Sequence, residues 1–240
     1  MNEAKKTHMS DRVKFYECDN FGKYKPSSML KAASEVAGYD YNIKGLPYQF
    51  LLEHKLAFLV SRVSFLIKRY PKDQEEIDLC TWENGKQRTL FIRGFEICSA
   101  GEKLVEAQVG WLLVNPFERK IIKPRDCPFP QPQLDEEFEC KPIGKIQSQN
   151  LEYIGERIIR YSDLDENGHV YNANYADIAM DFLPVDVLKK NINNFRINFN
   201  REAKLGDKVE IFGDLCDDIS IVIGKQDGQV CFEAEFTHSR

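Results

Sequence analysis

The stretch Tyr161-Ser-Asp-Leu-Asp165-Glu-Asn167-Gly-His169-Val-Tyr-Asn172-Ala-Asn-Tyr175 places a carboxylate, a carboxamide and an imidazole at alternate positions. Side chains at alternate positions of an extended backbone point to the same side. Asp165, Asn167 and His169 are therefore predicted to face one site. A helix from about Asn172 to Phe182 is predicted to follow and to end before Pro184. The first turn of that helix would present free backbone N–H groups to a developing oxyanion.

A degenerate copy of this stretch opens the first half of the chain. The aligned pairs are Asp19 with Asp165, Phe21 with Asn167, Gly22 with Gly168 and Lys23 with His169. The copy lacks both the carboxamide and the imidazole, so it cannot perform the same chemistry. The sequence therefore predicts one active site per chain, located in the second half.

Two further matches keep the same order along the chain. Residues 63–77 align with residues 197–211 without a gap, which places Lys68 on Glu202, and residues 106–109 align with residues 233–236. Preserved order indicates an internal duplication. We predict a first repeat over residues 1–123, a proline-rich linker over residues 124–149 and a second repeat over residues 150–240.

The hydrophobic pattern predicts the same elements in each repeat. Ser27 or Ser28 is expected to cap a helix over Met29–Tyr41, which carries a stripe of small apolar residues. Strands are indicated by alternation around residues 63–67, 105–113 and 230–236. A helix followed by a run of antiparallel strands is an α+β unit.

Composition narrows the class of protein. The net charge of −5 and the lack of a basic arm argue against a nucleic-acid partner. The seven cysteines are scattered without a Cys-x-x-Cys pair, so no metal site is expected and the cytoplasm is the expected compartment. The N-terminus is polar, and no apolar run approaches the roughly 18 residues of a membrane span. Clusters of Lys and Arg are expected to be solvated surface or a docking patch for an acidic carrier.

The stretch at 161–175 resembles the signature of the acyl-ACP thioesterases, D-L-D-x-N-x-H-V-N-N-x-x-Y. Residues 61–82 are similar to the s-R…R-Y-P…T-W pattern of that family's first repeat, and the resemblance covers nearly the whole chain. It implies a double hot-dog fold, in which each of two tandem repeats wraps an antiparallel sheet around a long helix. The activity it implies is hydrolysis of acyl-acyl carrier protein to a free fatty acid, which ends elongation.

The resemblance also implies the site. Asp165, Asn167, His169 and Glu202 would be catalytic, and the first repeat would supply the acyl pocket. The family carries Cys after the Glu, but this chain carries Ala203, so a thiolate mechanism is excluded there and a carboxylate is expected to act instead. The phosphopantetheine arm belongs to the substrate, so no cofactor of the protein's own is expected. Acyl carrier protein would be the partner, and a homodimer is compatible with the sequence.

Two alternative functions stay open. Enoyl-thioester hydratases of the double hot-dog class resemble Y-x-x-S-G-D-x-N-P-x-H, with five positions from Asp to His and an intervening Pro. Here four positions separate Asp165 from His169, and no Pro intervenes. A non-catalytic acyl-binding module would usually carry a basic helix-turn-helix segment, which this chain lacks. Asp163 and Asn172 are expected to be turn or cap residues, and Tyr171 replaces the family's Asn.

Overall fold

The computed structural model describes residues 5–129, 133–148 and 150–238. The elements of the first half are β1 (Thr7–Arg12), α1 (Pro26–Ile43), α2 (Tyr48–Glu53), β2 (Ala57–Ile67), β3 (Glu76–Gln87), β4 (Leu90–Ser99), β5 (Glu102–Asn115) and β6 (Lys120–Ile122). Those of the second half are β7 (Glu152–Ile158), α3 (Asn174–Asp181), α4 (Val185–Lys189), β8 (Ile192–Phe199), β9 (Lys208–Leu215), β10 (Ile219–Gln226) and β11 (Gln229–His238).

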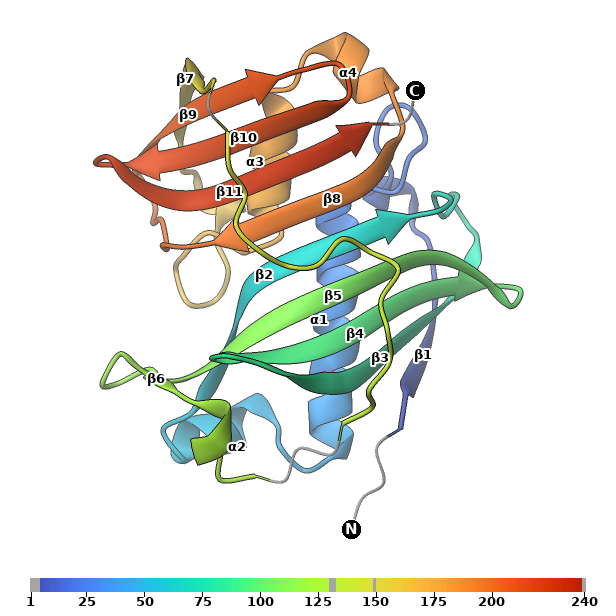
Figure 1. Ribbon diagram of the computed structural model, residues 1–240, viewed down its shortest axis with the longest axis vertical. Helices are drawn as coiled ribbons and strands as arrows, with labels where there is room; N and C mark the ends of the chain where they lie inside the picture. The colour runs from blue at the N-terminus through green and yellow to red at the C-terminus, as the bar shows by residue number, and fades with distance from the viewer. Residues whose placement is uncertain (1–4, 130–132, 149, 239–240) are drawn as a thin grey trace.

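The strands of both halves form one sheet. Its order is β1-β3-β4-β5-β2-β8-β11-β10-β9-β7, with β6 added on β5. The halves meet where β2 pairs antiparallel with β8, and there the rings of Phe65 and Phe195 stack with centroids 6.0 Å apart. The sheet curves around α1 in the first half and α3 in the second (Figure 1). The duplicated α+β layout predicted from the sequence is therefore present.

Alternation along the strands sorts side chains between the two faces of the sheet. Val63, Phe65 and Ile67 of β2 belong to the core that packs around the helices. Phe195 and Ile197 of β8 continue this core across the seam. The apolar surface removed from water on this concave face is the main stabilising contribution to the fold.

Helix α1 begins earlier than expected. It starts at Pro26, and neither Ser27 nor Ser28 caps it, because the N-cap residue is Lys25 and no side chain makes a cap hydrogen bond. Proline suits the first helical position, since the missing N–H has no partner there. The Ser28 hydroxyl instead donates to the carbonyl oxygen of Glu17 at 3.0 Å, which ties the helix to the preceding loop.

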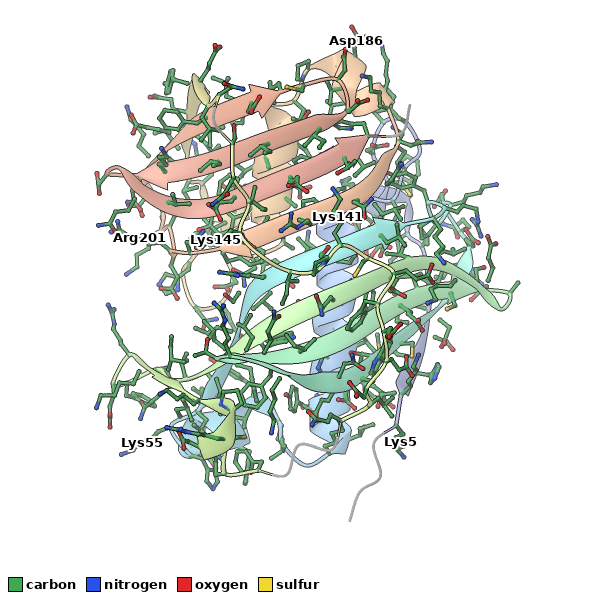
Figure 2. All side chains as sticks on the ribbon, in the orientation of Figure 1. Lys5, Lys55, Lys141, Lys145, Asp186 and Arg201 are labelled. Carbon is green, nitrogen blue, oxygen red and sulfur yellow. The ribbon has the colours of Figure 1, made fainter. Side chains whose placement is uncertain are left out.

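The segment between the repeats crosses the outer face of the sheet (Figure 1). Its backbone is held by side chains of the strands beneath it. Glu106 accepts the N–H of Glu139 at 2.6 Å, and Asn198 donates to the Gly144 carbonyl at 3.0 Å. Lys141 of this segment, labelled in Figure 2, lies 3.3 Å from Glu235. Residues 130–132 and 149 of the predicted linker lie outside the described residues.

Backbone hydrogen bonds correct the predicted alignment of the two repeats. The N–H of Lys72 donates to Glu75 at 2.8 Å, and the N–H of Lys204 donates to Asp207 at the same distance. Lys72 therefore corresponds to Lys204, and counting back two residues places Tyr70, not Lys68, opposite Glu202. The predicted register was wrong by two residues. A shift of two keeps every side chain on its face of the sheet, so alternation alone could not reveal it.

Candidate active site

The second-half loop is a tight turn built around Asp165. Its N–H donates to the His169 carbonyl at 2.9 Å, and the N–H of Gly168 returns to the Asp165 carbonyl at 3.0 Å. One carboxylate oxygen of Asp165 accepts the N–H of Asn167 at 2.9 Å. Gly168 has φ +76°, a conformation that a residue with a Cβ adopts only with strain. Asp165 is thus in part a turn-forming residue.

The first-half loop has the same backbone. Asp19 donates to the Lys23 carbonyl at 2.8 Å and accepts the N–H of Phe21 at 2.9 Å, and Gly22 has φ +75°. The turn therefore forms without a carboxamide or an imidazole. The side chains of Asn167 and His169 are therefore not needed to form the turn.

The structure brings His169 together with Glu202. The Nε2 atom of His169 lies 3.3 Å from Oε2 of Glu202, although 33 positions separate them in sequence. The backbone at His169 bridges to Lys204, and the N–H of Val170 donates to the carbonyl of Ala203 at 2.9 Å. The imidazole is about one-quarter exposed and the carboxylate about three-fifths, so both reach solvent.

The helix that follows does not supply the expected oxyanion site. Helix α3 starts at Asn174, later than the predicted Asn172. The N–H groups of Asn174, Tyr175 and Ala176 already donate to carbonyls of the preceding turn, at 2.8, 3.3 and 3.1 Å. The N-terminus of α3 therefore offers no free N–H group at these three positions, whereas the side chain of Asn167 is exposed.

Tyr175 holds the strand end that carries Glu202, a role that sequence reasoning missed. Its hydroxyl accepts the N–H of Ala203 at 3.0 Å and donates to the Arg201 carbonyl at 3.4 Å. These two groups flank Glu202 on either side. Arg201, labelled in Figure 2, lies just beyond the end of β8 at Phe199. The signal was the final Tyr of the signature, whose partner only the tertiary structure identifies.

Neighbouring groups have structural uses. Asp163 is buried and accepts the N–H of Arg160 at 2.7 Å and the Arg157 guanidinium at 2.8 Å, as expected of a turn residue. Burial raises the pKa of the Cys231 thiol, which lies in the core behind the Glu202 segment. Burial likewise raises the pKa of Tyr171, whose hydroxyl bonds to Ser34 of α1.

The corresponding place in the first half carries no acid–base pair. The ammonium group of Lys23 donates to the carbonyls of Leu188, Lys189 and Lys190 at 3.0, 2.8 and 2.6 Å, at the C-terminal end of α4. Tyr70, opposite Glu202 in the corrected alignment, bonds through its hydroxyl to the backbone of Ile192. Both side chains therefore make structural hydrogen bonds to backbone groups.

A difference in length separates the two halves. The N–H of Lys25 donates to the Glu17 carbonyl and that of Tyr171 to the Asp163 carbonyl, each at 2.9 Å, so Lys25 corresponds to Tyr171. Lys25 and Lys72 are 47 positions apart, whereas Tyr171 and Lys204 are 33 apart, which leaves 14 more residues in the first half. Helix α1 takes most of them, with 18 residues against 8 in α3.

No helix in the described part of the chain is long and apolar enough to cross a membrane. Among residues 5–129, 133–148 and 150–238, no group of three or more His, Cys, Asp or Glu side chains is placed to hold a metal ion.

Comparison with known protein families covers most of the chain. Residues 4–126 match the acyl-ACP thioesterase N-terminal domain, and residues 147–239 match the acyl-ACP thioesterase C-terminal domain. A palmitoyl-acyl carrier protein thioesterase of Arabidopsis thaliana is 25% identical over 169 residues, 64% of this chain and 40% of the relative. A dodecanoyl-[acyl-carrier-protein] hydrolase of Cinnamomum camphora is 25% identical over 164 residues, 62% of this chain and 42% of the relative. The chain spans about two-fifths of the length of these curated relatives.

Solved structures share the fold. An acyl-ACP thioesterase from Bacteroides thetaiotaomicron superimposes with a TM-score of 0.89 at 20% identity, covering 98% of each chain. The 12:0-ACP thioesterase from Umbellularia californica superimposes with a TM-score of 0.80 at 16% identity, covering 98% of this chain and 97% of that one. The double hot-dog architecture expected from the sequence is confirmed.

Proposed function

The chain belongs to the acyl-ACP thioesterase family, and from this premise and its second-loop geometry we propose that it hydrolyses acyl-acyl carrier protein to a free fatty acid. The observation that carries the proposal is the His169–Glu202 pair, 3.3 Å apart and solvent-accessible. At the positions that correspond to His169 and Glu202, the first half carries Lys23 and Tyr70. A reducing compartment, the cytoplasm, suits a chain whose cysteines are free.

In this reaction a water oxygen bonds to the thioester carbon, and the C–S bond breaks. Glu202 accepts the proton of the attacking water, since its carboxylate is free of the turn bonds that occupy Asp165. Asn167 donates its amide N–H to the developing oxyanion. His169 orients Glu202, takes this proton from it across their 3.3 Å contact and passes it to the departing thiolate, as the oxyanion collapses to the carboxyl group of the fatty acid. The phosphopantetheine arm leaves as a free thiol on its carrier.

The decisive test replaces the carboxylate without changing its shape. Glu202→Gln should lower kcat for acyl-acyl carrier protein by at least about a hundredfold, the usual contribution of an acid–base group. Glu166→Gln is the matched control, because Glu166 is an exposed glutamate on the loop that carries His169. Free thiol and free fatty acid would both be measured. Equal turnover by the two variants would refute the assignment of Glu202.

The same assay separates the alternatives. A hydratase would add water to an enoyl-acyl carrier protein without releasing thiol. A binding module would hold acyl-acyl carrier protein without consuming it. Acyl carrier protein and coenzyme A both present the acyl group on a phosphopantetheine arm. Assaying the same acyl group on each carrier in parallel therefore identifies which of the two the protein uses. Acyl carrier protein is our proposed carrier, on the strength of the family.

A further inference from the structure

A cavity lies at the end of the β2–β8 seam that is opposite to Glu202. Its volume is about 680 Å³, within the range of small-molecule sites. Three segments line it: the first-half loop, the end of β2 with the residues just after it, and the start of β8 with the residue before it. The 8 residues of β8 separate this end of the seam from the end near Glu202, a span of roughly 23 Å (Figure 1). We name this space the seam cavity.

The seam cavity has in the first half the place that the proposed catalytic site has in the second. Lys23 and Tyr70 both line it. These are the residues that correspond to His169 and Glu202 in the corrected alignment. The first half therefore keeps a hollow where its loop meets the end of β2, although the acid–base pair is absent there. Such a hollow is suited to binding a ligand without converting it.

Every charged residue among the described lining of the seam cavity is cationic. The four are Lys23, Lys68, Arg69 and Lys72. The chain as a whole carries a net charge of −5, so the cavity reverses the sign locally. A concave site lined by one sign of charge attracts ligands of the opposite sign. The cavity is therefore suited to an anion.

Lys23 lacks a carboxylate to balance its charge. Backbone carbonyls at the end of α4 accept its three hydrogen bonds, and burial lowers the pKa of its ammonium group. Asp19 acts on Lys23 from the same loop, but its Oδ1 atom accepts the backbone N–H groups of Phe21 and Lys23, each at 2.9 Å. An anion in the cavity would stabilise this charge.

Two of the other cations are already paired. Arg69 donates to both carboxylate oxygens of Glu75, at 3.1 and 2.7 Å, and Lys68 lies 2.7 Å from Glu139. The planar guanidinium that would bind a phosphate at two points is thus occupied. Lys72 is exposed, and no carboxylate of the described chain bonds to its ammonium group. One available ammonium matches a single carboxylate better than a phosphate.

Apolar side chains form the rest of the lining. Leu66 and Ile67 come from the end of β2, Ile192 from the start of β8 and Phe21 from the first-half loop. The Phe21 ring is 37% exposed and lies 5.6 Å from the Lys23 ammonium group. A hydrocarbon body attached to the anion would remove this apolar surface from water.

We propose that the seam cavity binds an amphipathic carboxylate, in which one anionic head group is attached to a hydrocarbon body. Lys72 donates to the carboxylate, Phe21 covers the hydrocarbon, and the charge of Lys23 adds to the attraction while its hydrogen bonds stay with α4. Fatty-acid anions, which the proposed reaction releases, belong to this class. Binding requires no turnover, so it goes beyond the proposed function and can be measured apart from it.

Isothermal titration of the full chain with decanoate tests this site. Lys72→Gln removes a charge from an exposed side chain and should weaken decanoate binding at least about tenfold, as expected for loss of a charge-assisted hydrogen bond. Phe21→Ser should weaken it about threefold or more, because part of the apolar wall is lost. Acetate, which has the head group alone, should bind at least about tenfold more weakly than decanoate.

Lys204→Gln is the matched control, because Lys204 is the exposed counterpart of Lys72 beside the catalytic loop. It should leave the Kd that responds to Lys72→Gln unchanged. A decanoate Kd that shifts with Lys204→Gln and not with Lys72→Gln would locate binding at the catalytic site and overturn the proposal. Equal Kd values for Lys72→Gln and the unchanged chain would overturn it as well, and so would tighter binding of inorganic phosphate than of decanoate. A failure to hydrolyse acyl thioesters would refute the proposed function and leave these Kd values to decide the seam cavity.

Discussion

Removal of one hydroxyl, in Tyr175→Phe, tests whether the structure holds Glu202 in place for catalysis. The hydroxyl accepts the N–H of Ala203 at 3.0 Å and donates to the Arg201 carbonyl at 3.4 Å. Ala203 is completely buried, so its N–H would lose its partner away from water. An unsatisfied buried donor costs about 1–3 kcal/mol, and the longer bond to Arg201 adds little. We expect the free energy of unfolding to fall by about 2 kcal/mol.

The loss of turnover should accompany the loss of stability. With its two flanking bonds gone, Glu202 no longer keeps its position 3.3 Å from His169. Misplacement of a catalytic group by about 1 Å can cost up to a hundredfold, so we expect kcat to fall at least about tenfold. KM should change little, because Tyr175 is buried in the core beneath the loop. Urea unfolding and steady-state thiol release measure the two effects.

The first half offers a matched control. Tyr70 stands opposite Glu202 in the corrected alignment, and its hydroxyl accepts the Ile192 N–H at 3.0 Å and donates to the Ile192 carbonyl at 3.2 Å. Tyr70→Phe should therefore cost similar stability with little change in kcat. Full turnover by Tyr175→Phe, or an equal loss in both variants, would refute the reasoning.

Three further predictions follow from individual residues. A thiol-modifying reagent should leave most activity intact, because burial raises the pKa of the core thiol Cys231 and Ala203 replaces the family's cysteine; inactivation of the folded protein, tracked by mass spectrometry, would contradict this. Gly168→Ala and Gly22→Ala should each destabilise by about 1 kcal/mol in thermal melts, since both glycines have positive φ, but only Gly168→Ala should slow turnover. The hydrogen bond from Arg69 lowers the pKa of Glu75 to about 2 from an ordinary 4.5, so its stabilisation is present above pH 4.5 and is lost as pH falls toward 2; Arg69→Met should flatten that part of the stability curve.

Prediction from the sequence succeeded for elements whose formation is determined by residues within a single segment. The strands at residues 63–67, 105–113 and 230–236 lie within β2, β5 and β11, because alternation reports which face of a sheet is buried. The start of α1 was misplaced, since Ser28 resembles a cap but its hydroxyl bonds to Glu17, eleven residues earlier.

The same distinction between local and long-range contacts applies to the candidate site. Asp165, Asn167 and His169 share one loop, but its backbone is a tight turn rather than the extended segment on which the alternate spacing was interpreted. That the three side chains face one site stays a prediction. The contact of His169 with Glu202 was expected only through the family resemblance, and its geometry comes from the bridge between the loop and the end of β8. Tyr175 could not be assigned a role, because its hydroxyl acts on a segment 26 to 28 residues away.

The sequence by itself determined the duplicated α+β plan and the half in which the polar loop survives, because hydrophobic alternation and residue type are local properties. The tertiary structure decided the alignment of the repeats, since a two-residue shift preserves alternation and only backbone hydrogen bonds distinguish the registers. It also decided the buried pairing of Asp40 with Arg93, 53 positions apart. That contact exists only because the sheet curves around α1 and brings a charge on the helix against a charge on β4.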